Sequence, residues 1–464
     1  MEGEFEGVEL GDRRLRQRVQ CVAGRLAERP EMSFPNVFEN DRELEGFYRL
    51  LRNEKVDAQK LLAPHVRNTV ERIEQIDGPV LCLHDTTTFT FEGRENLGII
   101  EGNIRGFLAH CSLAVGLDGM PQGGMRIQAW QRDANKPSPT KLRKMGMSQS
   151  AVREMPSEMD RWGESIMAVE DLMGHPGKLV HVADSEGDDY RLLSRLNQRG
   201  CRFVVRGCYD RQIIGGGEHT VLTTRVLVES PVASRSVKVA ARPAPKTKSA
   251  SPSKRNAPRQ GRTAELEIRA VAVSIKRPKL SSEVAASVEL NVVHVVEASP
   301  PEGQAPIEWT LLTGESIATP EAILTVVDMY RKRWVIEEFF KALKTGCAYE
   351  ARQLESFANF SNALALFVPV AWGLLRLRAL ERADSNLAVE GCFTPDQVFV
   401  LRAKSQTPVD TVAQALTAIA RMGGHIKNNG RPGWLVLWRG FRDLLLLAYG
   451  FGLGRRSATI SDQS

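Results

Sequence analysis

The chain has 464 residues, enough to bury more than one hydrophobic core, and this length predicts about two to three domains. Its seven cysteines are odd in number and form no C-x-x-C pair, which excludes a disulfide-stapled scaffold and predicts reduced thiols in an intracellular protein. The formal net charge of +6 permits a polyanionic partner, and the charged N-terminus lacks the apolar stretch of a signal peptide.

Residues 1 to about 75 are predicted to be helical. Asp12 can cap an arginine-rich helix that Pro30 ends, and a second helix is expected over Arg42 to Asn53. The product would be a small helical domain with a basic surface. Arginine-rich helix surfaces are often only solvated, so the pattern alone leaves DNA contact and simple solvation open.

From Gly78 onward, short β-rich runs alternate with helices, which predicts an α/β sheet. The apolar runs PVLCLHD and GKLVHVAD each end in an acid, at Asp85 and at Asp184. A lone acid there more often begins a turn or caps a helix, as Asp188 and Asp189 are expected to do. Two matched strand-end aspartates instead favour a site, because side chains at the carboxyl ends of strands line the clefts of such sheets.

After Arg206 the strand pattern is interrupted by a β-rich insertion of about a hundred residues, in which AELEIRAVAVSI, VELNVVHVV and IEWTLLT are predicted strands. Residues 234 to 262 hold nine Lys or Arg and no acid, interleaved with prolines, and are predicted to be a flexible basic loop. Such a loop could lie along phosphates or be a solvated linker.

Helical pattern resumes near Thr319 and continues almost to the end. The apolar runs Ala363 to Leu375 and Leu444 to Tyr449 fall short of the roughly 18 residues that a membrane span needs, so we expect core helices and no membrane partner.

A third acid can be selected on DMYRKRWVIEEFFKALKTG, taken as one continuous helix. At about 100° per residue, an arc of roughly 60° holds four polar residues, and Glu338 points elsewhere. These four are Tyr330, Arg333, Glu337 and Lys344. Such a stripe suits a metal ligand flanked by phosphate-binding groups, although for this helix alone an ordinary salt-bridged surface explains it equally well.

The spacing of these four residues, Y-(2)-R-(3)-E-(6)-K, resembles the signature of the IS-four family of bacterial insertion-sequence transposases, whose best-known member is the Tn-five transposase. Further landmarks follow in that family's order: LGDRR, EGFYRLLRN, LHDTTTFT, VADSEGDDY, RFVVR, EWTLLT and AIARMGGH. The resemblance implies an α/β, RNase H-like catalytic core with a β-rich insertion, plus helical N-terminal and C-terminal regions.

By this resemblance, Asp85, Asp184 and Glu337 form the catalytic triad and bind Mg²⁺ or Mn²⁺. The residues implied to hold transposon-end DNA are Tyr330, Arg333, Lys344, Trp309 and Arg206. Trp309 would stack on a flipped base, and the alternative is that it is a strand aromatic in the core of the insertion.

The resemblance predicts a division into a DNA-binding domain, a catalytic core, the insertion and a C-terminal dimerisation region. The boundaries expected are 1–75 for the first, 76–206 with 310–365 for the core, 207–309 for the insertion and 366–464 for the last. The expected activity is metal-dependent cut-and-paste transposition by a homodimer on DNA. Its partners would be double-stranded ends with terminal inverted repeats and target DNA, in the cytoplasm at the nucleoid.

Two other functions are compatible with parts of the sequence. A catalytically silent or repurposed transposase-derived DNA-binding protein predicts loss of triad acids, and all three are present. A carboxylate-pair glycan hydrolase leaves Arg333, Lys344 and the basic loop unexplained.

Overall fold

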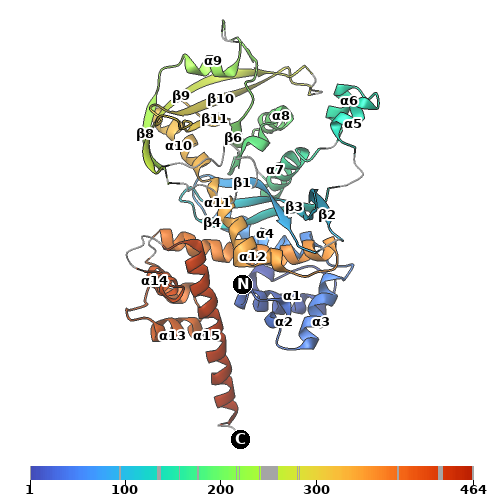
Figure 1. Ribbon diagram of the computed structural model, residues 1–464, viewed down its shortest axis with the longest axis vertical. Coiled ribbons are helices and arrows are strands. Elements are labelled where there is room, and N and C mark those ends of the chain that lie inside the picture. The colour runs from blue at the N-terminus through green and yellow to red at the C-terminus, as the bar shows by residue number, and fades with distance from the viewer. Residues whose placement is uncertain are drawn as a thin grey trace. The chain divides into compact units, whose positions relative to one another are not determined.

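The computed structural model describes residues 2–461 except 94–95, 133–136, 156, 175–176, 216, 219, 240, 242–259, 280, 282, 384–385 and 427–431. It divides into two compact units (Figure 1). Unit 1 comprises Met1–Val80, Asp85–Lys136 and Trp334–Ser464, and unit 2 comprises Leu81–His84 and Pro137–Arg333. Strand β1 (Val80–Thr90) therefore contributes its early residues to unit 2 and its later ones to unit 1.

The strands of unit 1 follow the order β2-β3-β1, with β4 pairing antiparallel to β3. Four helices precede them and the remaining helices follow Trp334. Their bounds are α1 (Arg13–Glu28), α2 (Phe34–Val37), α3 (Asp41–Leu51), α4 (Ala58–Glu74), β2 (Gly98–Glu101), β3 (Ile104–Val115), β4 (Pro121–Trp130), α11 (Trp334–Lys341), α12 (Phe357–Arg382), α13 (Pro395–Lys404), α14 (Val412–Met422) and α15 (Trp434–Ser461).

The N-terminal helices form as the sequence predicts. The Asp12 side chain accepts a hydrogen bond from the Arg14 amide and caps α1, and Asn40 caps α3 in the same way. Arg25, on α1, forms ion pairs with Glu39 and Glu43, so part of the basic surface is neutralised within the fold.

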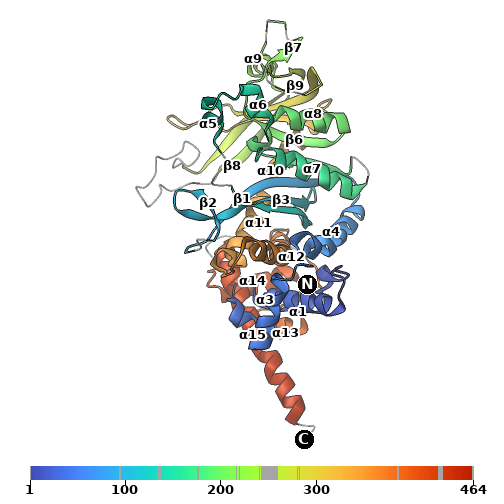
Figure 2. The same cartoon turned by 90° about the vertical axis from the view of Figure 1, so that its right-hand side faces the viewer.

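Helix α12 is the central apolar element of unit 1. By length and composition it could cross a membrane, but 67% of its most apolar window is buried inside the structure, as in the core helix of a globular unit. It packs on α4 and β4, and its Trp372 Nε1 donates to the Pro121 carbonyl. Figure 2 shows this helix beside α14, and α14 and α15 share a second apolar core with α13.

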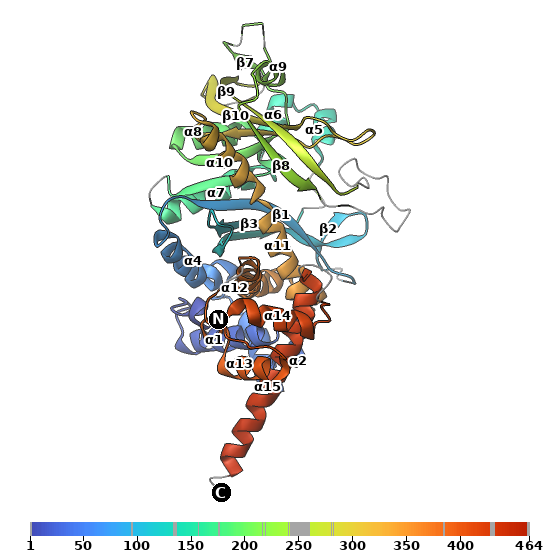
Figure 3. The same cartoon turned by 90° about the vertical axis from the view of Figure 1, so that its left-hand side faces the viewer.

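Unit 2 orders its strands β1-β5-β6-β11-β10-β9-β7, with β8 pairing β9. Their bounds, with those of the helices, are α5 (Pro139–Lys144), α6 (Gln149–Glu154), α7 (Asp160–Met173), β5 (Leu179–Ala183), α8 (Tyr190–Arg199), β6 (Arg202–Gly207), β7 (Ile213–Ile214), α9 (Leu222–Leu227), β8 (Ala233–Val239), β9 (Arg262–Lys276), β10 (Ser287–Glu297), β11 (Glu308–Thr313) and α10 (Pro320–Arg331). Helices α7 and α8 pack on one face of this sheet and α10 on the other (Figures 2 and 3).

The strand order β4-β3-β1-β5-β6, with β3 and β4 antiparallel and β5 and β6 parallel, is that of the ribonuclease H fold. Strands β7 to β11 are inserted between β6 and α10 and continue the sheet through β11, which pairs antiparallel with β6. The prediction of an α/β, RNase H-like core with a β-rich insertion and helical terminal regions is confirmed.

Four local expectations were wrong, and two of them concern segments that carry the site. Asp85 does not end its strand: the β-branched residues after it continue β1 to Thr90, and Phe89 is fully buried. The segment DMYRKRWVIEEFFKALKTG is not one helix, because α10 ends at Arg331, α11 begins at Trp334 and a π-helical turn covers Ala342–Gly346. Three consecutive cations, Arg331 to Arg333, stand at the end of α10 and interact favourably with the negative end of the helix dipole. The Arg333 amide donates to the Tyr330 carbonyl, which tightens the last turn.

The basic segment is also partly ordered. Its first residues form β8, where Arg235 pairs with Asp328, and its last, Arg262, begins β9 and pairs with Glu297. These arginines are neutralised inside unit 2. The interior of the segment, residues 242–259, lies outside the described residues.

The adjacent acids Asp188 and Asp189 have different roles, although capping was expected of both. Asp189 caps α8 through the Arg191 and Leu192 amides. Asp188 is buried and accepts from the Cys208 and Tyr209 amides and from the Arg211 guanidinium. It therefore fixes the chain that leaves β6.

This difference predicts unequal losses of stability. Asp188→Ala should lower the free energy of unfolding by roughly 3 to 5 kcal/mol, because it leaves the Arg211 charge buried without a partner. Asp189→Ala removes only a helix cap and should cost about 1 kcal/mol. Urea titrations of both variants measure the difference, and equal losses would contradict the assignment.

Candidate catalytic site

Asp184 is held at the end of a buried strand. It follows β5 directly, and its Oδ1 accepts from the Glu186 amide at 2.8 Å, which caps the short turn Ser185–Gly187. A Cβ at Gly187 would lie 2.8 Å from the Ala183 Cβ, so only glycine lets this turn pack closely on the strand. The half-buried carboxylate therefore projects from a fixed backbone.

A group of cationic and aromatic side chains lies around Tyr330 within unit 2. Burial raises the pKa of the Tyr330 phenol, and the charges of Arg206 and Arg333, with a hydrogen bond from Arg206, oppose that shift. The Asp184 carboxylate also acts on this phenol electrostatically. The Trp309 ring meets the Tyr330 ring edge to face at 5.6 Å. Two guanidinium groups, an indole and the Asp184 carboxylate thus lie around one phenol, that of Tyr330.

Asp85 is the corresponding acid of unit 1. Its residue is 9% exposed, and its Oδ1 accepts from the Thr86 amide at 2.8 Å. Burial, and then the charge of this carboxylate, raise the pKa of the Cys111 thiol on the neighbouring strand β3. Asp85 is therefore a rigidly held, partly desolvated carboxylate in the middle of a strand.

Lys344 lies on the π-helical turn and reaches back to β1. Its Nζ donates to the Thr88 carbonyl at 2.6 Å and lies 5.5 Å from the centroid of the Phe89 ring. The ammonium is thus directed along the strand that carries Asp85. With three protons on this ammonium, one bond to Thr88 still leaves donors for a phosphate.

The two neighbouring glutamates of α11 have different surroundings. Glu338 is 6% exposed and pairs with Arg378 and with Lys341, each at 3.1 Å. Arg382, one turn after Arg378 on α12, lies 3.7 Å from the same carboxylate. Glu337 is half-buried. Glu338 is therefore committed to holding α11 on α12, a role that the pair of arginines four residues apart could have signalled in the sequence.

Each unit brings together part of the predicted site. Unit 2 assembles Asp184, Arg206, Trp309, Tyr330 and Arg333, and unit 1 holds Asp85, Glu337 and Lys344. The four signature residues do not share one helical stripe, because the break after α10 and the π-turn interrupt the 100° progression. That all three acids form one metal site remains a prediction.

Two family models match the chain. The transposase DNA-binding model matches residues 1–56, and the transposase DDE domain model matches residues 179–368. This chain is a DDE transposase. The chain is also similar to the piggyBac transposase in a synaptic complex with hairpin DNA, at 10% identity and a TM-score of 0.35, covering 92% of this chain and 75% of that one.

The two family models cover some of the predicted site residues and not others. The DNA-binding match spans α1 to α3, so this transposase has a DNA-binding domain where the arginine-rich helix lies. The DDE match includes Asp184 and Glu337, whereas Asp85 precedes it. DDE domains generally use divalent metal ions, and the chain supplies carboxylates for them.

The different surroundings of the two glutamates predict separable mutant phenotypes. Glu337→Gln should abolish DNA nicking, because Glu337 is a proposed metal ligand, and should destabilise the fold less than Glu338→Gln, because Glu337 is only half-buried. Glu338→Gln should keep nicking at low temperature but lower the free energy of unfolding by roughly 3 kcal/mol, because Arg378 loses its buried partner. Nicking rates and thermal melts of both variants test this, and exchanged phenotypes would overturn it.

Proposed function

We propose that this DDE transposase performs cut-and-paste transposition, in the manner of the IS-four family. The observation that carries the proposal is the group around Tyr330 in unit 2, where the charges of Arg206, Arg333 and the strand-end carboxylate Asp184 all act on one phenol. Phosphodiester cleavage needs cationic groups that hold a phosphate next to a carboxylate that can bind a metal ion. This group supplies both.

The triad suits a hard divalent cation. Asp85, Asp184 and Glu337 offer only oxygen donors, which Mg²⁺ and Mn²⁺ prefer. Two of them, Asp85 and Asp184, are fixed by hydrogen bonds from backbone amides, so they need little reorganisation to bind. When bound, such ions activate an attacking oxygen and stabilise the leaving one.

The remaining residues would position DNA. Arg333 and Arg206 can each grip a phosphate with a planar fork, whereas Lys344 acts as a point charge on the strand that carries Asp85. Trp309 is half-buried against Tyr330, which leaves part of its ring available for a flipped base. In this proposal Trp309 both packs the insertion and stacks on DNA.

The DNA steps need no covalent protein intermediate. Water attacks the phosphodiester at the element's end, the P–O3′ bond breaks and a 3′ hydroxyl is released. That hydroxyl attacks a phosphodiester of the opposite strand, which forms a hairpin and releases a 3′ hydroxyl on the flanking DNA. A second water breaks the new P–O3′ bond and reopens the hairpin, and the same hydroxyl then joins target DNA as a P–O3′ bond of the target breaks. Arg206, Arg333 and Lys344 would hold the phosphates during these exchanges, which keeps the attacking oxygen aligned with the P–O bond that breaks.

The proposed partners are double-stranded ends with terminal inverted repeats, target DNA and a second copy of the chain bound through residues 366–464, at the nucleoid. A catalytically silent DNA-binding relative is not favoured, because all three acids are present and Asp85 and Asp184 are held by the fold.

The test is a nicking assay on supercoiled DNA that carries the inverted repeats flanking the gene. Nicking at the repeat ends should require Mg²⁺ or Mn²⁺ and stop with EDTA, because carboxylates alone cannot activate water sufficiently at neutral pH. Asp184→Asn should bind end DNA within a few fold of wild type yet fail to nick. Undiminished nicking in EDTA, or by Asp184→Asn, would rule out this mechanism.

A further inference from the structure

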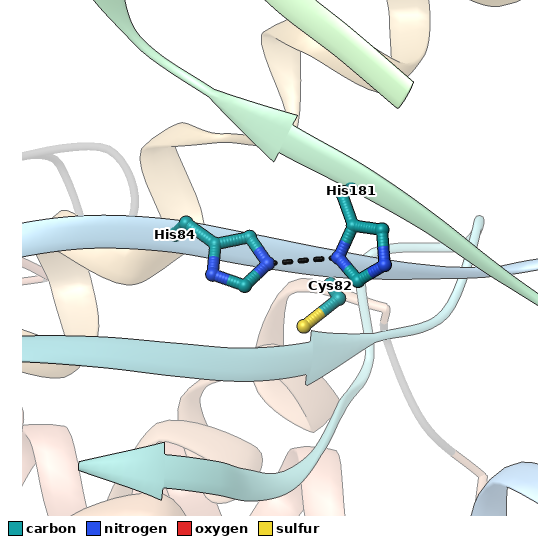
Figure 4. Close-up of side chains that lie close together, drawn as sticks. All are labelled: Cys82, His84 and His181. Atoms are coloured by element: carbon teal, nitrogen blue, oxygen red, sulfur yellow. Dashed lines mark hydrogen bonds between the residues drawn. The ribbon is translucent and has the colours of Figure 1, made fainter. Parts of the chain in front are cut away.

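A second set of metal-ligand side chains lies inside unit 2, apart from the carboxylates. Cys82 and His84 occupy alternate positions of β1, and His181 lies on the neighbouring strand β5. One ligand atom from each lies within 4.8 Å of the others (Figure 4). All three residues are 0% exposed. Two imidazoles and a thiol buried at one point of a sheet are unusual, because burying polar groups costs free energy unless each finds a partner.

The two rings face each other through their nitrogens. His84 Nε2 lies 2.9 Å from His181 Nδ1, and the Cys82 side chain lies beneath this pair (Figure 4). Without an ion, a single proton bridges the two nitrogens. With Zn–N distances of about 2.05 Å, two nitrogens of a tetrahedral zinc lie about 3.4 Å apart, so small ring rotations would admit the ion.

A carboxylate orients the second imidazole. Glu170, on α7, is 4% exposed, and its Oε1 lies 2.7 Å from His181 Nε2. A carboxylate accepts, so His181 carries a proton on Nε2 and presents a lone pair on Nδ1 toward Cys82 and His84. Metal-ligating histidines typically have this arrangement, in which a carboxylate holds the other ring nitrogen and sets the tautomer.

The charges also balance when an ion is present. The charges of a divalent cation, the Cys82 thiolate and the Glu170 carboxylate sum to zero, whereas without the cation Glu170 is a buried acid beside the His181 imidazole. Burial, and then the Glu170 charge, raise the pKa of the Cys82 thiol, so an ion must displace the thiol proton. The thiol proton leaves for each ion bound, and the proton that bridges the two imidazoles in the ion-free protein would move to His84 Nδ1.

We propose that Cys82, His84 and His181 form a zinc site that joins β1 to β5, with Glu170 as the positioning residue for His181. The nitrogen and sulfur donors favour Zn²⁺ over the Mg²⁺ or Mn²⁺ proposed for the carboxylates. The proposed zinc site lies next to two of the proposed catalytic acids along the chain, because His84 directly precedes Asp85 and His181 stands three residues before Asp184. The ion would hold in register the two strands that carry these acids.

The experiment is a Co²⁺ titration of the full chain in excess Mg²⁺, followed by absorption spectroscopy. Cobalt bound by a thiolate gives a sulfur-to-metal charge-transfer band that carboxylate sites cannot give. Wild type should bind one Co²⁺ with this band, and Zn²⁺ should displace it. Metal analysis of the purified protein should find one zinc per chain.

Variants separate the role of Cys82 as a ligand from that of Glu170 as a positioning residue. Cys82→Ala should lose the charge-transfer band, whereas Cys347→Ala, a matched control at an equally buried thiol, should keep it. Glu170→Gln should keep the band but weaken Co²⁺ binding about 10- to 100-fold, because His181 loses its orienting carboxylate. Circular dichroism reports folding of each variant.

Wild-type protein that shows no charge-transfer band at saturating Co²⁺ would overturn the proposal and leave a metal-free hydrogen-bond chain, whatever the variants do. A band that persists in Cys82→Ala would overturn it as well. Neither result depends on nicking, so the zinc site can fail while the proposed transposition mechanism stands.

Discussion

The structure depends on one strand, β1, whose backbone is hydrogen-bonded to β5 on one side and β3 on the other. Its early residues belong to unit 2 and its later ones to unit 1, and the division falls between His84 and Asp85. Because side chains alternate along a strand, a shift of one residue in pairing would move every one of them to the wrong face. The register of β1 thus decides whether Asp85 is available for chemistry. Pairing of β1 with β5 and with β3 fixes that register.

The buried acids of this transposase that pair with arginines have a different role from the half-buried Asp184. Asp188, Glu297 and Glu338 are buried in ion pairs with arginines and hold elements together. Asp184 is only half-buried, and a backbone amide in a short turn fixes it. A carboxylate that the fold holds in place but does not neutralise is suited to bind a metal ion, whereas one already paired with a guanidinium is not. Beside Asp184, the charges of Arg206 and Arg333 act on the Tyr330 phenol.

Much of the fold could be predicted because its strands are continuous apolar runs and its helices begin at cap residues such as Asp12 and Asp189. Aspartates at the predicted ends of two runs also identified Asp85 and Asp184 as candidates. The prediction that Tyr330, Arg333, Glu337 and Lys344 share one face of a continuous helix was wrong. A count of 100° per residue cannot anticipate the break after Arg331 or the π-helical turn that contains Lys344. Cys82, His84 and His181 went unnoticed because the third lies 97 positions from the second and only strand pairing brings them together.

The central claim is that Asp85, Asp184 and Glu337 bind the same metal ions. Its most direct test is Mn²⁺ binding to the DNA-bound full chain, followed by the electron paramagnetic resonance of free Mn²⁺, for Asp184→Asn, Glu337→Gln and the double variant. A shared site predicts that the two losses of binding free energy are coupled by roughly 0.5 to 3 kcal/mol. Losses that add to within about 0.5 kcal/mol would mean independent sites and would contradict the account.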